Sequence, residues 1–530
     1  MVALACCFSL TAYAQKLSIK GTVTDENGDP LFGASVVVMS GKTILGGGTT
    51  TDLSGSYVIS AEPGQSLEIS FIGYKSQTVS ITAQKTVYSV KMEVDSRTVD
   101  EVVVIGAGPA GLFAALRLIE CGLRPILFER GKEVVERGKD IAKIQRNQGV
   151  NPDSNYAFGE GGAGTFSDGK LFTRSKKRGD YNRALQRLVF HGASPEILYE
   201  AHPHIGSDRL PRIIANMRDA IRAAGGEVHF ERRVEELIVR NGRVEGVIAG
   251  GDRVEAQAVV IATGHSARDI YYMLHRSGVR LEAKAYAMGV RIEHPQSLID
   301  ESQYGTYDPV LPPADYKLVR HLDEETVYTF CMCPGGYVVA AASEEGRVVT
   351  NGMSYADRDG ENANAALLVS VNPKEFPFDG PLGGMYWQRQ IEERAYAISG
   401  SYRAPAQKVG DFLAKRPSTE CGSVKPTYRP GVHWCDLHDV LPTALTDAME
   451  EALPKLDGML KGFAQADAVL TAPETRSSSP VRINRDDTRQ SSLKGLYPTG
   501  EGAGYAGGIT SAAMDGVKVA EAIIKKYRRI

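Results

Sequence analysis

The sequence has 530 residues, more than one hydrophobic core usually serves, so two or three domains are expected. Hydrophobic residues make up 42% of the chain, charged residues make up 24%, and the formal net charge is −3. This composition is that of a globular protein without a basic surface or an apolar run of about 18 residues, so neither nucleic acid nor a membrane span is expected.

The first 14 residues have some features of a secretory signal. Val2–Leu10 is a short apolar stretch, and Ala12-Tyr13-Ala14 matches a signal-peptidase site before Gln15, but no Lys or Arg precedes the stretch. A working signal and a truncated or wrongly assigned start both remain open. The expected location is the cell envelope if residues 1–14 act as a signal, and the cytoplasm for the second half of the chain otherwise.

Residues 15–97 predict a small all-β sandwich. Short alternating segments such as LSIKGTVTD and SLEISFIGYKS are separated by turns rich in Gly, Ser and Asp, and Asn27-Gly28 is typical of a tight hairpin. No set of catalytic or metal-ligating residues occurs here, which favours a binding or spacer module.

The sequence of this module resembles that of a known domain. GTVTDENGDPLFGASVVV, TTTDLSGSYVIS and LEISFIGYKSQTVSI are similar to the carboxypeptidase regulatory-like domain that begins many TonB-dependent outer-membrane receptors. In those receptors the next segment, DEVVVxGYG, begins the plug. Here DEVVVIGAG is followed by neither plug nor barrel, so the resemblance does not imply transport.

A dinucleotide-binding unit is predicted from residue 98 onward. Val102–Ile105 is a short β-branched strand, Gly106, Gly108 and Gly111 form G-x-G-x-x-G before a helix, and PILFER is a second strand ending at Glu129. The glycines allow a tight turn, approach of a pyrophosphate and close helix packing, while Glu129 can accept from ribose hydroxyls. Further candidate cofactor contacts adjoin these positions at Pro109, Ala110 and Arg130.

Three later segments favour FAD over NAD, because they resemble elements of two-dinucleotide-binding-domain flavoproteins. Val234 begins a predicted β-meander at the place where the backbone would meet adenine, and Ala262-Thr263-Gly264 resembles their A-T-G element. GLYPTGEGAGYAGGITSAAMDG resembles their second FAD motif, with Gly500-Glu501 where Gly-Asp is usual. The resemblance implies cofactor contacts at Val234, Thr263, Gly264, Gly500, Glu501, Gly507, Gly508 and Ile509.

The stretch FGEGGAGTFSDGKLFTR at 158–174, with TFCMCPGGYVVAAASEEG at 329–346, resembles a family of uncharacterised FAD-dependent dehydrogenases over essentially all of 101–530. The resemblance implies a flavoprotein oxidoreductase without a settled substrate. It also implies that Gly161, Gly162, Gly164 and Thr165 line the flavin ring, with Ser167, Asp168 and Lys170 as weaker candidates.

Other reactive residue types have simpler interpretations. Cys331 and Cys333 lie two apart on a predicted strand, but small buried residues are favoured over a redox pair. His202 and His204 are favoured as exposed loop residues, and His433, Asp436 and His438 match no familiar metal spacing. Arg476 and Arg482 could neutralise an anionic substrate or reduced flavin, or form solvated ion pairs. No acid, base or metal ligand is assigned.

The predicted fold class is α/β: a Rossmann-type FAD-binding domain with an inserted α+β cap domain, preceded by the sandwich. The predicted segments are 1–14 signal-like, 15–97 sandwich, 98–279 FAD domain, 280–460 cap and 461–530 FAD domain. We predict hydride transfer through flavin N5 to or from a small molecule, with NAD(P)H at most a transient reductant. A non-catalytic or redox-sensing FAD protein, and an envelope binding protein led by the sandwich, are the alternatives.

Overall fold

The computed structural model describes residues 16–41, 43–71, 74–93, 101–173, 179–306, 308 and 310–527. These residues form two compact units, one up to residue 93 and one that takes nearly all residues from 101 on. The signal-like segment 1–14 and the polar link DSRTVD at 95–100 lie outside the described residues.

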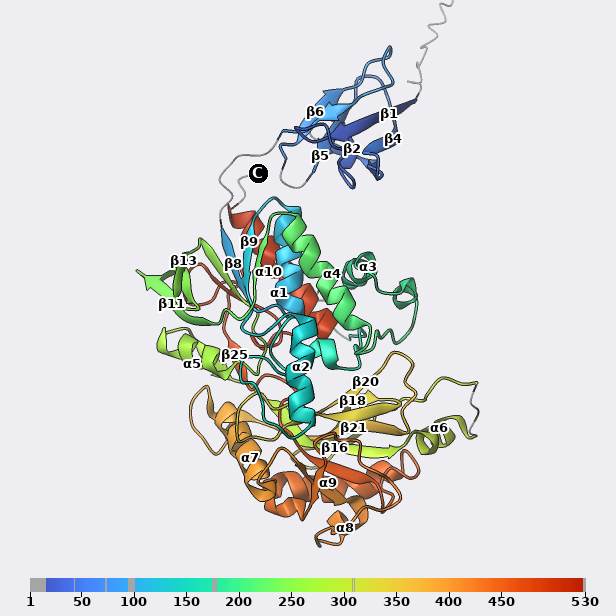
Figure 1. The fold of residues 1–530 in the computed structure, drawn as a ribbon, viewed down its shortest axis with the longest axis vertical. Helices are drawn as coiled ribbons and strands as arrows, with labels where there is room; N and C mark the ends of the chain where they lie inside the picture. Colours follow the sequence, from blue (N-terminus) through green and yellow to red (C-terminus); the bar gives the residue numbers. More distant parts are fainter. Residues whose placement is uncertain are drawn as a thin grey trace, which may run out of the picture. The chain divides into compact units, whose positions relative to one another are not determined.

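The first unit is built from two sheets whose strands pair mostly antiparallel (Figure 1). One sheet has the order β4 (Ser56–Ala61), β1 (Leu17–Thr24), β7 (Val90–Lys91), and the other β3 (Thr43–Thr50), β2 (Ser35–Ser40), β5 (Ser66–Ser70), β6 (Gln77–Ser80). Alternate residues of the strands, including Val36 and Leu67, are buried in one apolar core. The predicted all-β sandwich is confirmed.

The second unit contains a five-stranded parallel sheet. Its order is β10 (Glu227–His229), β9 (Pro125–Phe128), β8 (Val102–Ile105), β14 (Ala258–Ile261), β26 (Leu496–Pro498). Every residue of β8 is buried, as expected for a central strand covered on both faces. The segment Val102–Ile105 is therefore the middle strand of this sheet and belongs to the second unit.

Helices cover the parallel sheet (Figure 1). They are α1 (Pro109–Glu120), α4 (Leu210–Ala223) and α10 (Ile509–Tyr527), while α3 (Tyr181–Phe190) packs against α10. A Cβ on Gly516 would lie 2.1 Å from the carbonyl oxygen of Ala110, so α1 and α10 pack with their backbones close together. The meander β11 (Val234–Arg240), β12 (Arg243–Ala249), β13 (Asp252–Glu255) forms a separate antiparallel sheet. The predicted Rossmann-type architecture is confirmed.

A seven-stranded mixed sheet forms the core of the remaining part. Its order is β17 (Val319–His321), β18 (Thr326–Cys333), β21 (Asn362–Val371), β16 (Tyr286–Pro295), β24 (Val469–Glu474), β22 (Ala404–Lys408), β23 (Val432–Trp434). Helices α7 (Gly383–Ser399) and α9 (Thr443–Asp457) pack against it with a continuous apolar core. Strand β24 of this sheet lies beyond residue 460.

Shorter elements complete the second unit: α2 (Val134–Gln145), α5 (Arg268–Arg276), α6 (Gln296–Tyr304), α8 (Val409–Leu413), β15 (Leu281–Ala283), β19 (Gly336–Ala340), β20 (Thr350–Ser354) and β25 (Val481–Ile483). Strands β15 and β25 pair with each other, as do β19 and β20. Among the helices in the described ranges, none combines the length and the apolar character needed to cross a bilayer.

Candidate cofactor site

A cavity of about 880 Å³ opens where the carboxyl ends of β8 and β14 face strands β18 and β24 of the mixed sheet. Ligands of open α/β sheets bind at such strand ends. Most predicted cofactor residues line this cavity: Gly106, Gly108, Pro109, Ala110, Glu129, Arg130, Gly162, Gly164, Val234, Thr263, Gly264, Gly500, Glu501, Gly507, Gly508 and Ile509. Gly111, Gly161 and Thr165 do not line it.

The three glycines of the turn after β8 have different structural roles. Gly106 has φ +104°, and a Cβ there would lie 2.6 Å from the Ala262 carbonyl oxygen. A Cβ on Gly111 would lie 1.9 Å from the Gly106 carbonyl oxygen, so Gly111 lets helix and turn pack although it does not reach the cavity. A Cβ on Gly108 would meet no protein atom closer than 4.0 Å. The space beside Gly108 is therefore open, as a pyrophosphate cradle requires.

Glu129 lies at the end of β9 and is buried. Its Oε2 accepts from the backbone N–H of Ala107 at 2.9 Å, and its Oε1 accepts from those of Gly131 and Gly159 at 2.9 and 3.0 Å. These bonds fix the carboxylate between the β8 turn and the 158–169 loop. Because Oε2 accepts only one of these bonds, its second lone pair remains able to accept from a ribose hydroxyl.

Arg130 is held at the cavity wall by two ion pairs and an aromatic ring. Its guanidinium lies 2.8 Å from Asp153 and 2.8 Å from Asp269, and its Cζ lies 4.3 Å from the centre of the Phe158 ring. Burial opposes its charge, yet the two carboxylates raise the pKa of Arg130 above its ordinary value. Arg130 thus presents a fixed planar surface at this end of the cavity.

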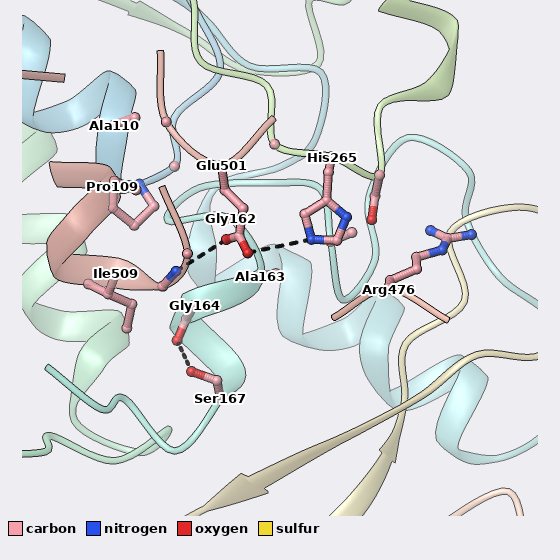
Figure 2. A pocket seen from close by; sticks show the side chains of 18 of the residues that line it. Pro109, Ala110, Gly162, Ala163, Gly164, Ser167, His265, Arg476, Glu501 and Ile509 are labelled. Atoms are coloured by element: carbon pink, nitrogen blue, oxygen red, sulfur yellow. Dashed lines mark hydrogen bonds and ion pairs between the residues drawn. The ribbon is translucent and has the colours of Figure 1, made fainter. Parts of the chain in front are cut away.

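The loop at 158–169 packs against the dinucleotide turn. The Gly161 N–H donates to the Ala107 carbonyl at 2.8 Å, and Thr165 Oγ1 donates to the Glu160 carbonyl at 3.4 Å. Gly161 and Thr165 thus support the loop from behind, while Gly162 and Gly164 face the cavity beside Pro109 and Ile509 (Figure 2). The weaker candidates Ser167, Asp168 and Lys170 also line it.

Glu501 points into the same space (Figure 2). Its Oε2 lies 3.5 Å from the N–H of Gly508, and its Oε1 lies 3.8 Å from Nε2 of His265. Burial raises the pKa of Glu501 to about 7, whereas burial and the charges of Arg476 and Arg268 lower that of His265 to about 3. At neutral pH the imidazole is therefore uncharged beside a carboxyl that can either carry or release a proton.

The turn that carries Gly500 and Glu501 is fixed by α10. Asp515 accepts from the Gly500 N–H at 2.8 Å and from Thr499 Oγ1 at 2.9 Å, and Arg485 Nη2 lies 2.6 Å from its other oxygen. Although burial opposes ionisation of Asp515, Arg485 and these hydrogen bonds hold its pKa below the ordinary value. The ionised Asp515 thereby positions the turn.

Arg476 approaches the cavity from the segment after β24 and is nearly buried (Figure 2). Its Nε and Nη2 donate to Glu392 at 3.0 and 2.8 Å, and Arg268 donates to the same carboxylate at 2.8 Å from each of two nitrogens. Arg476 is thus part of a buried charge cluster, while Arg482 lies 5.5 Å from the Tyr505 ring.

The remaining reactive residues differ in their relation to the cavity. His202 lines it with an exposed side chain, whereas His204 Nε2 lies 3.0 Å from the Ala356 carbonyl oxygen. His438 lies 2.6 Å from both Asp436 and Glu450. Within the described residues no three or more His, Cys, Asp or Glu side chains are arranged so that they could hold a metal ion. Cys331 lines the cavity and Cys333 is buried behind it.

Two residues that line the cavity, His265 and Arg358, were not predicted from the sequence. His265 directly follows Ala262-Thr263-Gly264, so its position after the motif could have indicated it. Arg358 forms a 2.9 Å ion pair with Asp168, which lies 190 residues away in sequence. No local pattern in the chain could have indicated that second contact.

The fold and this cavity define the class: an FAD-binding flavoprotein of Rossmann type with a second, carboxypeptidase regulatory-like module. Three family models match in agreement: "FAD-dependent protein, C-terminal domain-like" over 285–477, "FAD binding domain" over 101–136 and "CarboxypepD_reg-like domain" over 19–104. FAD as the cofactor is thereby confirmed.

The chain is 49% identical over 431 residues to an uncharacterized protein of Clostridium beijerinckii, covering 80% of this chain and 81% of that protein. The chain belongs to the family of this clostridial protein, the FAD-dependent proteins that carry this C-terminal domain.

Two further likenesses concern parts of the molecule. One hundred residues are 42% identical to the TonB-dependent receptor SusC of Bacteroides thetaiotaomicron, covering 19% of this chain and 9% of the receptor. The crystal structure of CtdE in complex with FAD has 12% sequence identity and a TM-score of 0.32, covering 80% of this chain and 84% of CtdE.

Proposed function

We propose that this protein is an FAD-dependent oxidoreductase that transfers a hydride through flavin N5 to or from a small-molecule substrate. One observation carries the proposal. The cavity that contains the dinucleotide turn at Gly108 is also lined by Thr329, Phe330 and Met332 of β18 and by Glu474 of β24. A cofactor and a second molecule can therefore share one cavity.

We propose that the mixed sheet is the cap of this site and that the chain returns to the FAD domain after β24. The pairing of β24 with β16 and β22 supports a return after Glu474 rather than near residue 460. In this organisation 98–279 and the C-terminal segment hold the cofactor, and the segment between them faces the substrate.

The flavin supplies the two-electron chemistry when bound, and the residues of this chain position it and handle protons. The turn from Gly106 to Gly111 would accommodate the pyrophosphate, Glu129 the ribose, and Gly500-Glu501 the ribityl side. Glu501, with a pKa of about 7, is suited to hold or release a proton near neutral pH. The Arg476 guanidinium would favour negative charge in the cavity.

We propose further that any NAD(P)H acts as a transient reductant. The support is that, among the described residues, the parallel sheet has one G-x-G-x-x-G turn inside a complete βαβ unit, at Gly106–Gly111, and this turn is the one proposed for FAD. Gly502, Gly504 and Gly507 have the same spacing before α10, but no described strand follows that helix.

The test is an anaerobic absorption experiment on the purified full chain. We expect an oxidised-flavin spectrum that bleaches with NADH or NADPH and returns when a small-molecule acceptor is added. Flavin that no acceptor or reductant changes would favour the non-catalytic alternative. Protein that neither contains nor takes up FAD would contradict the assignment of the cavity.

A further inference from the structure

Strand β18 is interrupted where it reaches the cavity. Its pairing with β21 runs in register from Val327 to Phe330 and resumes at Cys333, so the intervening residues form a bulge. Cys331, in that bulge, has φ +44°, a conformation uncommon for a residue other than glycine. Such backbone costs roughly 1–3 kcal/mol and is concentrated at functional sites. Here it coincides with the position at which Cys331 enters the cavity wall.

The two cysteines contact each other. The Cys333 thiol donates to the Cys331 carbonyl oxygen at 3.3 Å. Because the bulge at Cys331 interrupts the extended strand, the Cys333 thiol is turned back toward the backbone of Cys331 instead of lying a regular strand spacing away from it. The pair is therefore placed so that the sulfurs can be joined.

Two cationic groups lie near the pair, and one of them, Arg291, is itself paired with Glu474 at 3.2 Å. The fully buried Arg291 donates from Nη2 to the Cys331 carbonyl at 3.0 Å and lies 3.6 Å from Cys333 Sγ. Lys170 lines the same cavity, and the opposing charge of Asp168 is paired with Arg358.

The two thiols differ in acidity. The neighbouring Cys333 thiol lowers the pKa of Cys331, and Lys170 and Arg291 add to this against the effect of burial. The neighbouring Cys331 and burial raise the pKa of Cys333. A reactive thiolate at the cavity beside a protonated partner behind it is the arrangement of an attacking and a resolving cysteine.

We propose that Cys331 and Cys333 are a redox-active dithiol that exchanges two electrons with the FAD bound in this cavity. On oxidation of the pair, the Cys331 thiolate and the Cys333 thiol form one S–S bond, two electrons pass to the oxidised flavin, and the Cys333 proton passes to the reduced flavin or to solvent. In the opposite direction reduced flavin breaks the S–S bond and both thiols are regenerated. The inference rests on the proposed flavin function and adds a second redox centre to it.

The experiment is a reductive titration of the full chain loaded with FAD. The protein is oxidised with diamide, desalted, made anaerobic and titrated with dithionite while the visible flavin absorbance is followed. The wild type is expected to take up four electrons per flavin, because the flavin and the disulfide are each two-electron couples. Cys331→Ser and Cys333→Ser are expected to take up two. Cys421→Ser, which alters an exposed cysteine outside the cavity lining, is expected to behave as the wild type.

A readout independent of the variants is alkylation of the wild type followed by peptide mass. The peptide with both cysteines is expected to carry no label after diamide and two labels after reduction. Uptake of two electrons by flavin-loaded wild type, or an alkylated pair after diamide, would overturn the inference and leave the flavin function intact. Protein without flavin would overturn both.

Discussion

Arg476 and Glu392 are joined by two parallel hydrogen bonds, of 3.0 and 2.8 Å, although neither residue is appreciably exposed. Glu392 also receives two bonds from Arg268, so two guanidinium groups share one carboxylate, and Arg268 has a second carboxylate partner in Glu344 at 2.8 Å. Burial opposes its ionisation, but the charges of Arg268 and Arg476 hold the pKa of Glu392 below its ordinary value. Because Arg476 lines the cavity, the same charged cluster contributes both to the stability of the cap and to the electrostatic potential in the site.

We expect Glu392→Gln to destabilise the second unit by about 3–5 kcal/mol, because it leaves two buried guanidinium groups without a full counter-charge. Denaturant unfolding followed by circular dichroism measures the change. Glu393→Gln is the matched control: this neighbour is exposed and pairs at the surface with Arg347, so a change below about 1 kcal/mol is expected. Equal changes in the free energy of unfolding for the two substitutions would show that the buried cluster contributes no more to stability than the surface ion pair.

Gly108→Val is expected to abolish FAD binding while leaving the apoprotein folded. A Cβ at this position meets no protein atom closer than 4.0 Å, so the side chain would occupy the cofactor's space instead of clashing with the chain. Flavin content after purification and the Tm of the apoprotein are the measurements. Gly111→Val, where a Cβ would lie 1.9 Å from a carbonyl oxygen, should lower the apoprotein Tm as well. A Gly108→Val protein with full flavin content would contradict the assignment of Gly108 to the pyrophosphate-binding turn.

Glu501→Gln is expected to change the pH dependence of stability. Burial raises the pKa of Glu501 from 4.5 to about 7, so the folded protein binds this proton more tightly than the unfolded chain does. The resulting stabilisation is complete below pH 4.5 and is lost as the pH rises through about 7. The glutamine variant lacks this loss.

We therefore expect the stability of Glu501→Gln relative to wild type to increase between pH 4.5 and 7, by on the order of 1 kcal/mol. Chemical unfolding of the apoproteins at several pH values measures it, since bound FAD would contribute its own stabilisation. Glu301→Gln, at an exposed site on α6, serves as the control. A difference that stays constant over this pH range would contradict the assignment.

A chain of residues 98–530 is expected to hold as much FAD as the full chain. Every residue that lines the cavity lies between Ile105 and Ala512, so the sandwich contributes none of them. Flavin occupancy and Tm of the two proteins should agree. A truncated protein that folds but cannot retain flavin would make the sandwich part of the cofactor site.

Local patterns predicted the parts of this molecule that depend on neighbouring residues. The strand Val102–Ile105, the glycine turn and Glu129 form one continuous βαβ unit, and the spacing alone identified it. The Cys331 environment could not be predicted in this way. An unbroken strand was expected, whereas pairing with β21 produces a bulge that turns Cys331 toward the cavity. The Asp168–Arg358 pair likewise exists only because the fold brings distant segments together.

The string DEVVVIG lies where two modules meet, and the matches at 19–104 and 101–136 overlap there. The structure places Val102–Ile105 in the parallel sheet. This supports the hypothesis of a gene fusion near residues 97–102. In this hypothesis a receptor-like first module was joined to a flavoprotein at a short sequence that both contain.

The cavity draws its walls from both ends of the second unit: Gly106 begins the turn after β8, and Ile509 begins α10. These positions are roughly 400 residues apart, which at about 5–20 residues per second is tens of seconds of translation. The complete cavity therefore exists only after α10 has been synthesised, and until then a nascent chain has only part of its lining.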